Sequence, residues 1–467
     1  MESQIKPIKQ SVLILTLIII VLPYTLVIES CKKYVEIGPP HTQIVRSAVF
    51  TSNETATAAQ TVIYSQIELD LNYYLSIYLG CAADEFISYD QSLDAQQFFT
   101  NSLIPSNGIV YNLWSSAYRH IYQANAVLEG LSDNTAVTPQ VKKQLVGEAK
   151  FIRAFCYFYL ANIFNDVPIV KSTNYEENRL LSRSNISEVY KFIVKDLQEA
   201  KDSLNAYYVS SDGLTETSER VRPSKAVASA LLAKVYLYLE DWKNAEQESN
   251  SIIDQGKYEL SSDLNSAFTK DSKEAIWQLS NNTNTYAGFV YILLTPSFVA
   301  LNPDLLSSFE TGDLRKQNWV SYLIQNQDTF YYPYKYKAVP SSNPVEYTII
   351  FRLSEQYLIR AEARVKQKKF DIARNDINVI RNRSSLPSIS FNDETSLSLA
   401  IEKERNTELF SELGHRWLDL KRTKRLDLLM PEICQRKGSK WESHQKVFPI
   451  PQQERSTDPN LTQNPGY

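Results

Sequence analysis

Two stretches of the chain repeat the same spacing of small and apolar residues, and this repeat constrains the fold more than any other feature. The first stretch is AVASALLAKVYLYLEDWKNAEQESNSIIDQG at 226–256, and the second is SEQYLIRAEARVKQKKFDIARNDINVIRN at 354–382. Each is typical of two helices joined by a short turn. The corresponding positions are Leu232, Ala233, Tyr236, Ala245 and Ile252 in the first stretch, and Tyr357, Ala361, Ala373, Ile377 and Ile380 in the second.

A helix pair of this kind buries one face only by stacking on similar pairs. The spacing matches the tetratricopeptide pattern of about 34 residues, and residues 139–204 supply a candidate third pair. Apolar periodicity also predicts helices at 111–131, 140–164, 187–204 and 397–423, whereas strand-like alternation is limited to short pieces such as EYTIIFRL. We therefore expect a mainly α-helical repeat scaffold, located chiefly at 111–260 and 351–425.

Two long segments, 81–110 and 261–350, do not follow the repeat. The second is rich in Asn, Ser, Pro and aromatic residues, in a chain with 29 Tyr, 19 Phe and 6 Trp. Long irregular segments of a compact domain often carry function. A tyrosine ring has an apolar face and a polar tip, which suits a partly hydrated binding surface, although packing of helices is the alternative for each ring. We therefore expect the ligand-binding residues in these two segments.

The N-terminus is weakly basic, and an apolar run at 11–28 precedes Ser30-Cys31. This order is typical of a bacterial lipoprotein signal, which is cut before a cysteine that carries lipid. A retained spanning helix is the alternative, but the run is at the short end of what ~30 Å of hydrocarbon requires. We expect residues 1–30 to be a signal peptide, Cys31 to be lipidated, and 31–52 to form an extended tether through Pro39-Pro40.

Charge and cysteine content exclude two other classes. The formal net charge of -4 provides no electrostatic attraction for nucleic acid. Beyond Cys31, the widely spaced Cys81, Cys156 and Cys434 do not suggest a disulfide framework. Cys156 lies in the aromatic stretch RAFCYFYL, where we expect it to act as a small buried apolar residue.

A glycoside hydrolase requires a pair of carboxylates, and Glu404 and Glu408 would share one face of a helix. Basic residues surround them in the sequence, namely Lys403, Arg405, Arg416 and Arg422. This favours a structural ion-pair network over a catalytic pair. The four histidines are scattered without an HExxH pair, and no GxSxG, CxxC or phosphate-binding glycine loop occurs. We therefore expect no catalytic residues, no metal site and no cofactor.

Several segments together resemble one family, the SusD/RagB lipoproteins of Bacteroidota. They occur in the family's order from Cys31 to Tyr467, and they include GEAKFIRAFCYFYLANIFNDVPIV, FETGDLRKQNW, EKERNTELFSELGHRWLDLKR and the ending FPIPQQERSTDPNLTQNPGY. Asn165 departs from the family pattern, which usually has glycine before Asp-Val-Pro. The resemblance implies a SusD-like domain at 53–467, with the helical repeats as its scaffold and 81–110 and 261–350 as its ligand-binding segments.

The resemblance also implies a function and a partner. Such proteins are anchored by lipid in the outer membrane, face outward, bind a glycan or another nutrient, and pass it to a SusC-like TonB-dependent transporter without breaking bonds. We expect Tyr286, Phe289 and Tyr291 to stack on the ligand, with Trp319 ranked lower, and Tyr89 and Asp84 to border the same surface. Lys335-Tyr336 is expected to hold the scaffold.

Two other functions stay open at this point. A tetratricopeptide-type adaptor would bind peptides and place its exposed aromatic residues in the concave groove of the helices. A glycan-binding protein would place them on its loops. A hydrolase would release reducing sugar.

Overall fold

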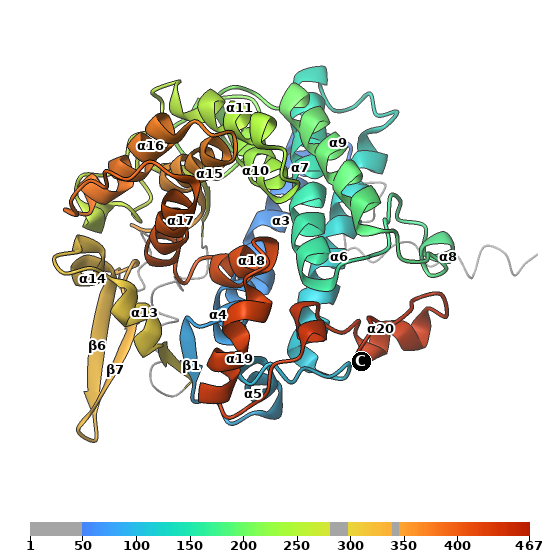
Figure 1. The fold of residues 1–467 in the computed structure, drawn as a ribbon. Helices are drawn as coiled ribbons and strands as arrows, with labels where there is room; N and C mark the ends of the chain where they lie inside the picture. The colour runs from blue at the N-terminus through green and yellow to red at the C-terminus, as the bar shows by residue number, and fades with distance from the viewer. Residues whose placement is uncertain (1–48, 281–297, 339–344) are drawn as a thin grey trace, which may run out of the picture. The chain divides into compact units, whose positions relative to one another are not determined.

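Helices make up most of the described chain, which comprises residues 49–280, 298–338 and 345–467 in this computed structural model (Figure 1). The chain divides into two compact units, Met1–Val49 and Phe50–Tyr467, and every helix and strand named here belongs to the second. Within these described ranges, no helix combines the length and the apolar character needed to cross a bilayer.

The first half of the second unit is built on long helices. α7 (Pro139–Phe164) packs between α6 (Gly108–Leu131) and α9 (Ile186–Ser203), and these three lie side by side in Figure 1. The side chain of Asn107 begins α6 by accepting the backbone N–H groups of Ile109 and Val110. The remaining helices of this half are α3 (Asn53–Ile67), the π-helical turn η1 (Glu68–Asn72), α4 (Tyr73–Ala82), α5 (Leu93–Phe99) and α8 (Tyr175–Asn178).

The predicted helix pairs are confirmed in both repeat stretches. The first is α10 (Lys225–Tyr238) with α11 (Trp242–Ile253), and the second is α15 (Leu353–Lys366) with α16 (Phe370–Arg383). α11 packs on α15, so the two pairs stack directly although about a hundred residues separate them. α7 and α9 form the third pair, with α8 inserted between them.

Small residues allow these helices to approach closely. Ala361 on α15 and Ala373 on α16 belong to one buried cluster, together with Val365, Ile377 and Ile401. α7 is buried on nearly all sides, and Cys156 is fully buried there as predicted. Among the described residues, Cys81, Cys156 and Cys434 are all free and buried. Asn165 ends α7 with a φ of 68°, the left-handed region that glycine adopts most easily, which explains why a glycine would fit this position.

The predicted helix at 397–423 is wrong as a single element. It is two helices, α17 (Glu394–Glu408) and α18 (His415–Arg422). Positive φ angles at Ser411, Leu413 and Gly414 turn the chain between them. Lys335 stabilises this turn because its Nζ donates to the backbone oxygens of Glu408 and Phe410, both at 2.8 Å. The break thus depends on a residue far away in the sequence, although Lys335 has the structural role that we expected.

The segment at 261–350 contains regular structure in its described part, so our expectation of an irregular segment is only partly met. β4 (Ala275–Leu279) pairs with β8 (Thr348–Arg352), and β6 (Val320–Gln325) pairs with β7 (Asp328–Pro333). β5 (Val299–Leu301) pairs with β1 (Phe86–Ser88) and joins the two predicted ligand-binding segments. All these ladders are antiparallel, as is the short pair of β2 (Tyr208–Val209) and β3 (Glu216–Thr217). The remaining α-helices of the described chain are α13 (Pro303–Ser308), α14 (Leu314–Trp319), α19 (Leu426–Arg436) and α20 (Gln452–Thr457), and two short 3-10 helices are η2 (Leu264–Ser266) and η3 (Ser443–Lys446).

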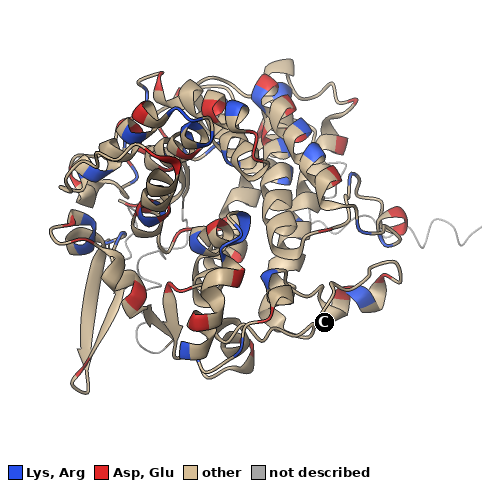
Figure 2. Ribbon diagram, in the orientation of Figure 1, with Lys and Arg blue, Asp and Glu red and all other residues tan. Residues whose placement is uncertain are grey.

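Charged residues of both signs are interspersed along the helices, whereas the β6–β7 hairpin is nearly free of them (Figure 2). Its one charged residue is Asp328, at the tip. The hairpin therefore differs in chemistry from the helical surface.

Candidate functional site

The β6–β7 hairpin presents aromatic and apolar side chains on both of its faces. Its turn residues Asn326 and Gln327 have φ angles of 52° and 73°, which is the backbone that a two-residue hairpin turn requires. Side chains alternate between faces along each strand. Tyr322 (57% exposed) and Ile324 (68% exposed) lie on the outer face, where the ring of Tyr322 is 6.0 Å from that of Tyr331 on the opposite strand.

The other face of the hairpin meets the segment that follows β1. Phe330 contacts Tyr89 edge-to-face, with 5.5 Å between the ring centroids and 83° between the ring planes. The backbone N–H of Tyr89 donates to the carbonyl oxygen of Phe298 at 2.6 Å, which fixes the start of this loop. Partial burial, together with the charge of Asp328, raises the pKa of Tyr89. Its hydroxyl is therefore protonated at neutral pH and can donate a hydrogen bond.

Between these elements lies a cavity of about 420 Å³, which we call the Tyr89 cleft. Its walls come from β1, β5, α13, α14 and β7 and are mostly apolar. Lys316 provides the only charged side chain among the described lining residues, and its Nζ donates to the carbonyl oxygen of Leu306 at 3.0 Å. The lining residues are Ile87, Tyr89, Ala300, Leu301, Pro303, Leu306, Ser307, Lys316, Thr329, Phe330 and Tyr331.

A cleft of this kind suits a ligand with both apolar and hydroxyl surfaces. Ring faces attract C–H groups, while the tyrosine hydroxyl groups, Ser307 and Thr329 offer hydrogen bonds. Concave sites with apolar walls and a few polar groups are typical of small-molecule binding sites. In the residues that the structure describes, no group of three or more His, Cys, Asp or Glu side chains is arranged to hold a metal ion.

The structure places the predicted ligand residues in different environments. Tyr89 lines the cleft and is 38% exposed. Cys31, Tyr286, Phe289 and Tyr291 lie outside the described residues, as does the segment 1–30. The described chain resumes after 281–297 at Phe298, which is exposed and bonded to Tyr89.

The expectation for Trp319 is corrected by its position. Its side chain is 0% exposed, and its indole N–H donates to the carbonyl oxygen of Leu264 at 2.9 Å. It packs edge-to-face on Phe268, with 5.4 Å between the ring centroids. Because no face of the ring is accessible, Trp319 belongs to the core and has no surface for a ligand.

Asp84 is also separated from Tyr89. Both carboxylate oxygens of Asp84 accept hydrogen bonds from the guanidinium of Arg416 at 2.8 Å. Although burial alone would raise its pKa, the charge of Arg416 lowers it, so Asp84 is ionised at neutral pH. Asp84 therefore holds an arginine and does not border the Tyr89 cleft.

Sequence reasoning passed over Phe330 and Tyr331 as ligand candidates. The stretch SYLIQNQDTFYYP alternates residues on two faces around a short polar turn, which is the signal of a hairpin. That signal could have shown that Tyr322 and Tyr331 share one face and Phe330 lies on the other. The meeting of Phe330 with Tyr89, more than two hundred residues earlier, had no comparable signal.

The ion-pair network predicted around Glu404 and Glu408 is confirmed, but its cations differ from the expected ones. Arg315 contacts both carboxylates, at 2.8 Å from Glu404 and 3.3 Å from Glu408. Arg381 lies 2.6 Å from Glu404, while Arg352 and Arg383 also pair with Glu408. The residues that we expected in these roles bind other acids: Lys403 binds Glu310, Arg405 binds Asp419, Arg416 binds Asp84, and Arg422 binds Glu362.

This network has no access to a substrate. Glu404 and Glu408 are buried. Burial alone would raise the pKa of Glu408, but Arg383, Arg352 and Arg315 hold it well below its usual value. A general acid needs a raised pKa and a path to the glycosidic oxygen. The pair is therefore arranged to join α17 to β8 and α14, not to transfer protons.

Comparisons with known proteins support the fold and the family. Residues 33–237 match a family model described as "Starch-binding associating with outer membrane", and residues 318–467 match a model described as "SusD family". A SusD-like protein of Formosa agariphila is 24% identical over 473 residues, covering 87% of this chain and 91% of that protein. A SusD-like protein of Bacteroides ovatus is 25% identical over 257 residues, which are 52% of this chain and 44% of the relative.

Solved structures show the same fold. A SusD superfamily protein from Bacteroides vulgatus superposes with a TM-score of 0.78 at 20% identity, covering 90% of this chain and 100% of that chain. A structure described as a laminarin-binding SusD-like protein has a TM-score of 0.72 at 24% identity, with 90% and 100% covered. Surface glycan-binding protein A from Bacteroides uniformis has a TM-score of 0.76 at 19% identity, with 88% and 99% covered. Because the two matched family models together cover well over half of its length, the chain belongs to the SusD family.

Proposed function

We propose that this protein binds an oligosaccharide at the Tyr89 cleft and delivers it to a SusC-like TonB-dependent transporter in the outer membrane. The observation that carries the proposal is the cleft itself, a cavity of about 420 Å³ whose lining includes Tyr89, Phe330 and Tyr331. It lies beside the β6–β7 hairpin, which has a single charged residue. The descriptions of two structural neighbours, one as laminarin-binding and one as surface glycan-binding, support a carbohydrate as the ligand class.

The chemistry of the cleft fits capture followed by release. A pyranose ring has C–H faces that pack on Tyr89 and Phe330, while its hydroxyl groups bond to the hydroxyl of Tyr89 and to Ser307. Each contact contributes little, because a hydroxyl bonded to protein has given up its bond to water. Binding of this type is reversible, as delivery to a second protein requires.

The proposal is tested by affinity electrophoresis and calorimetry of the purified full chain against laminarin and a panel of other polysaccharides. We expect Tyr89→Ala and Phe330→Ala each to weaken binding roughly tenfold, which corresponds to about 1.4 kcal/mol for one lost stacking ring. Tyr122→Ala is the matched control, because Tyr122 is similarly exposed but lies on α6. Equal affinities for the Tyr89 variant, the Tyr122 variant and the unmodified chain would exclude the cleft as the site.

We further propose that Cys31 is lipidated and that the lipid holds the protein in the outer membrane, facing outward. Metabolic labelling with a fatty acid should mark the chain, and Cys31→Ala should abolish the label and release the protein from the membrane fraction. Co-purification of a TonB-dependent transporter with the anchored chain would test the partner. Recovery of the protein without any transporter under mild detergent conditions would count against delivery.

The exposed aromatic residues favour glycan binding over peptide binding. Tyr89, Phe298, Tyr322 and Tyr331 are exposed and belong to the predicted ligand-binding segments, not to the paired helices of the repeats. No bond cleavage is part of the proposal, and the sealed Glu404–Glu408 network supports that view. Release of reducing sugar from any polysaccharide of the panel would overturn it.

A further inference from the structure

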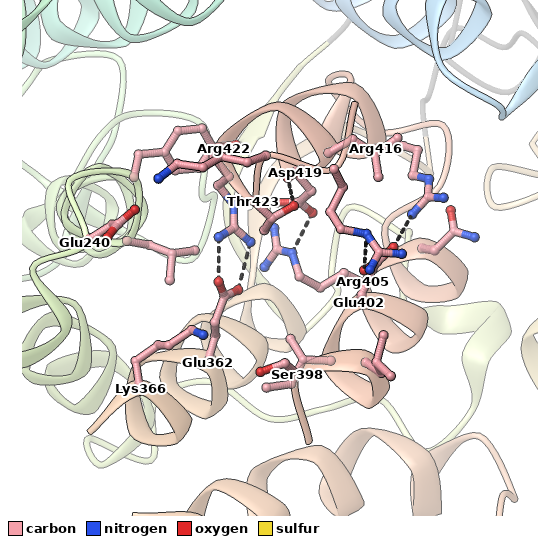
Figure 3. Close-up of a pocket in the computed structure, with 18 of the residues that line it drawn as sticks. Glu240, Glu362, Lys366, Ser398, Glu402, Arg405, Arg416, Asp419, Arg422 and Thr423 are labelled. Atoms are coloured by element: carbon pink, nitrogen blue, oxygen red, sulfur yellow. Dashed lines mark hydrogen bonds and ion pairs between the residues drawn. The ribbon is translucent and has the colours of Figure 1, made fainter. Parts of the chain in front are cut away.

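A second cavity lies within the helical scaffold, on elements other than those of the Tyr89 cleft. It has a volume of about 450 Å³, and we call it the helical pocket. Figure 3 shows the Arg422–Glu362 pair on one side, Arg416 with Glu402 on the other, and Asp419 between them. The lining residues belong to α10, α11, α15, α17, α18 and the turns beside them, together with Glu85 in the turn between α4 and β1.

Part of the helical pocket is apolar. Leu237 and Trp242 come from the α10–α11 pair, Leu399 and Ile401 from α17, and Leu420 from α18. Leu399 lines the pocket and is 51% exposed. An occupant with an apolar body would cover these side chains and gain the corresponding hydrophobic free energy.

The charges of the helical pocket are unevenly neutralised. Arg422 is well paired, because its guanidinium contacts Glu362 at 2.6 Å and Asp419 at 2.8 Å. Arg416 is held from behind by Asp84, and Lys366 by Glu394. Arg425, by contrast, has one ion-pair partner among the described residues, Glu402, at 3.4 Å. Lys424 makes no ion pair within the described chain, so the side of the pocket formed by the α18–α19 turn carries cations that are weakly paired.

Several buried polar atoms of the lining have no hydrogen-bond partner among the described residues. They include both terminal nitrogens of Arg405, the hydroxyl of Tyr238 and the Oγ of Ser398. The Nε of Arg425 also makes no hydrogen bond there, and its acidic neighbour Glu402 is 3.4 Å away. One carboxyl oxygen of Glu85 is also unpartnered. Burial raises the pKa of that carboxyl to about 8, so at neutral pH it carries a proton and can donate as well. Every unpartnered group in the lining can therefore act as a donor.

Buried donors without acceptors are costly, and a set of them indicates a missing acceptor. Water could satisfy some of them, but water would leave the apolar wall uncovered. A carboxylate satisfies several N–H donors at once, and bonds between a guanidinium and a carboxylate are among the strongest in proteins. We propose that the helical pocket is a second binding site, which takes an organic anion with a carboxylate head and an apolar body.

The carboxylate would lie toward Arg425, Lys424 and Arg405, and the apolar body would lie against Leu399 and Trp242. This arrangement is independent of glycan binding, since the helical pocket and the Tyr89 cleft share no lining residue. The two sites can therefore be tested separately on the same protein.

The test uses calorimetry of the full chain with hexanoate, indole-3-acetate and the neutral indole-3-acetamide. We expect the two acids to bind and the amide to bind roughly tenfold more weakly or not at all, because it lacks the charge. Leu399→Trp should block the pocket, and Arg425→Gln should weaken the acids roughly tenfold. Arg436→Gln is the matched control, since Arg436 is a partly exposed arginine on α19 that pairs with Asp304 and Glu432 outside the pocket.

Three results would overturn the proposal. The first is absence of binding by both acids at millimolar concentration. The second is equal affinity for indole-3-acetate and its amide, which would show an apolar site without anion recognition. The third is unchanged acid binding in both Leu399→Trp and Arg425→Gln, which would place the bound acid elsewhere. Polysaccharide binding by these variants should equal that of the unmodified chain, so a failure here leaves the glycan proposal intact.

Discussion

Glu85 should make the stability of this protein depend on pH in a direction opposite to that of most carboxylates. It lies between α4 and β1, is 1% exposed, and accepts the backbone N–H of Ser411 at 3.1 Å through one oxygen only. Burial, and then the charge of Asp84, raise its pKa from 4.5 to about 8. The folded protein therefore holds a proton that the unfolded chain releases at neutral pH.

The size of the effect follows from linkage between proton binding and folding. Each pH unit between the two pKa values changes the free energy of unfolding by ~1.36 kcal/mol. Below pH 4.5 the carboxyl is neutral in both states and has no effect. Above this value the unfolded state is favoured increasingly, and the loss reaches about 5 kcal/mol near pH 8.

Glu85→Gln isolates this effect, because glutamine retains the acceptor oxygen and the size of the side chain but cannot ionise. We expect the variant to unfold at about the same urea concentration as the unmodified protein at pH 4.5, and to be more stable by several kcal/mol at pH 8. Urea denaturation at both pH values measures the difference. Glu177→Gln, at an exposed position of α8, serves as the control.

The reasoning fails if the difference between the Glu85 variant and the unmodified protein is the same at both pH values. That outcome would mean that the carboxyl ionises in the folded protein at its ordinary pKa, and hence that water or a cation reaches it. A pH-dependent difference of equal size in the Glu177 variant would show that the effect is not specific to the buried carboxyl.

Three further predictions concern the scaffold. Glu408→Gln should lower the free energy of unfolding by about 3–5 kcal/mol, because it leaves three buried arginines without a full counter-charge, and chemical denaturation would detect it. Trp319→Ala should also lower the free energy of unfolding by ~3–5 kcal/mol, because it removes a fully buried ring, while the folded protein keeps its affinity for polysaccharide. A loss of affinity without a loss of stability would show that Trp319 contacts the ligand. Gly414→Ala should lower the free energy of unfolding by about 2 kcal/mol or more, because φ is 67° and an added Cβ would lie 2.4 Å from the side chain of Leu79. A thermal midpoint equal to that of the unmodified protein would contradict this reasoning.

The helix pairs could be predicted because their signal is local. Positions such as Ala361 and Ala373 recur at helical spacing, and a helix that must bury one face on a neighbour shows that requirement in its own sequence. Asn165 was singled out by the family resemblance, in which glycine usually precedes Asp-Val-Pro, and its positive φ in the structure supplies the physical reason. The number and spacing of the cysteines predicted that they form no disulfide framework, and the aromatic neighbours of Cys156 predicted its burial.

The errors concern contacts between distant segments. Periodicity continued through 409–414, so the sequence predicted one helix where Lys335 and the Gly414 turn produce two. Counting nearby basic residues identified the network of Glu404 and Glu408 but assigned it the wrong cations, since Arg315 and Arg352 arrive from other elements. Trp319 and Asp84 lie in segments that were expected to bind the ligand. Only the burial of Trp319 and the pairing of Asp84 with Arg416 showed that both belong to the scaffold.

By itself, the sequence determined the mainly helical repeat architecture, the family resemblance and the expectation that aromatic residues in 81–110 and 261–350 bind the ligand. Only the tertiary structure decided that Tyr89 meets Phe330, that Trp319 is buried, and that weakly paired cations and buried donors without acceptors surround a pocket between the helices. The physical reason is that helical periodicity is set by hydrogen bonds between near neighbours in the chain. A binding surface is instead the sum of side chains that folding brings together from far apart, and no local pattern records their distances.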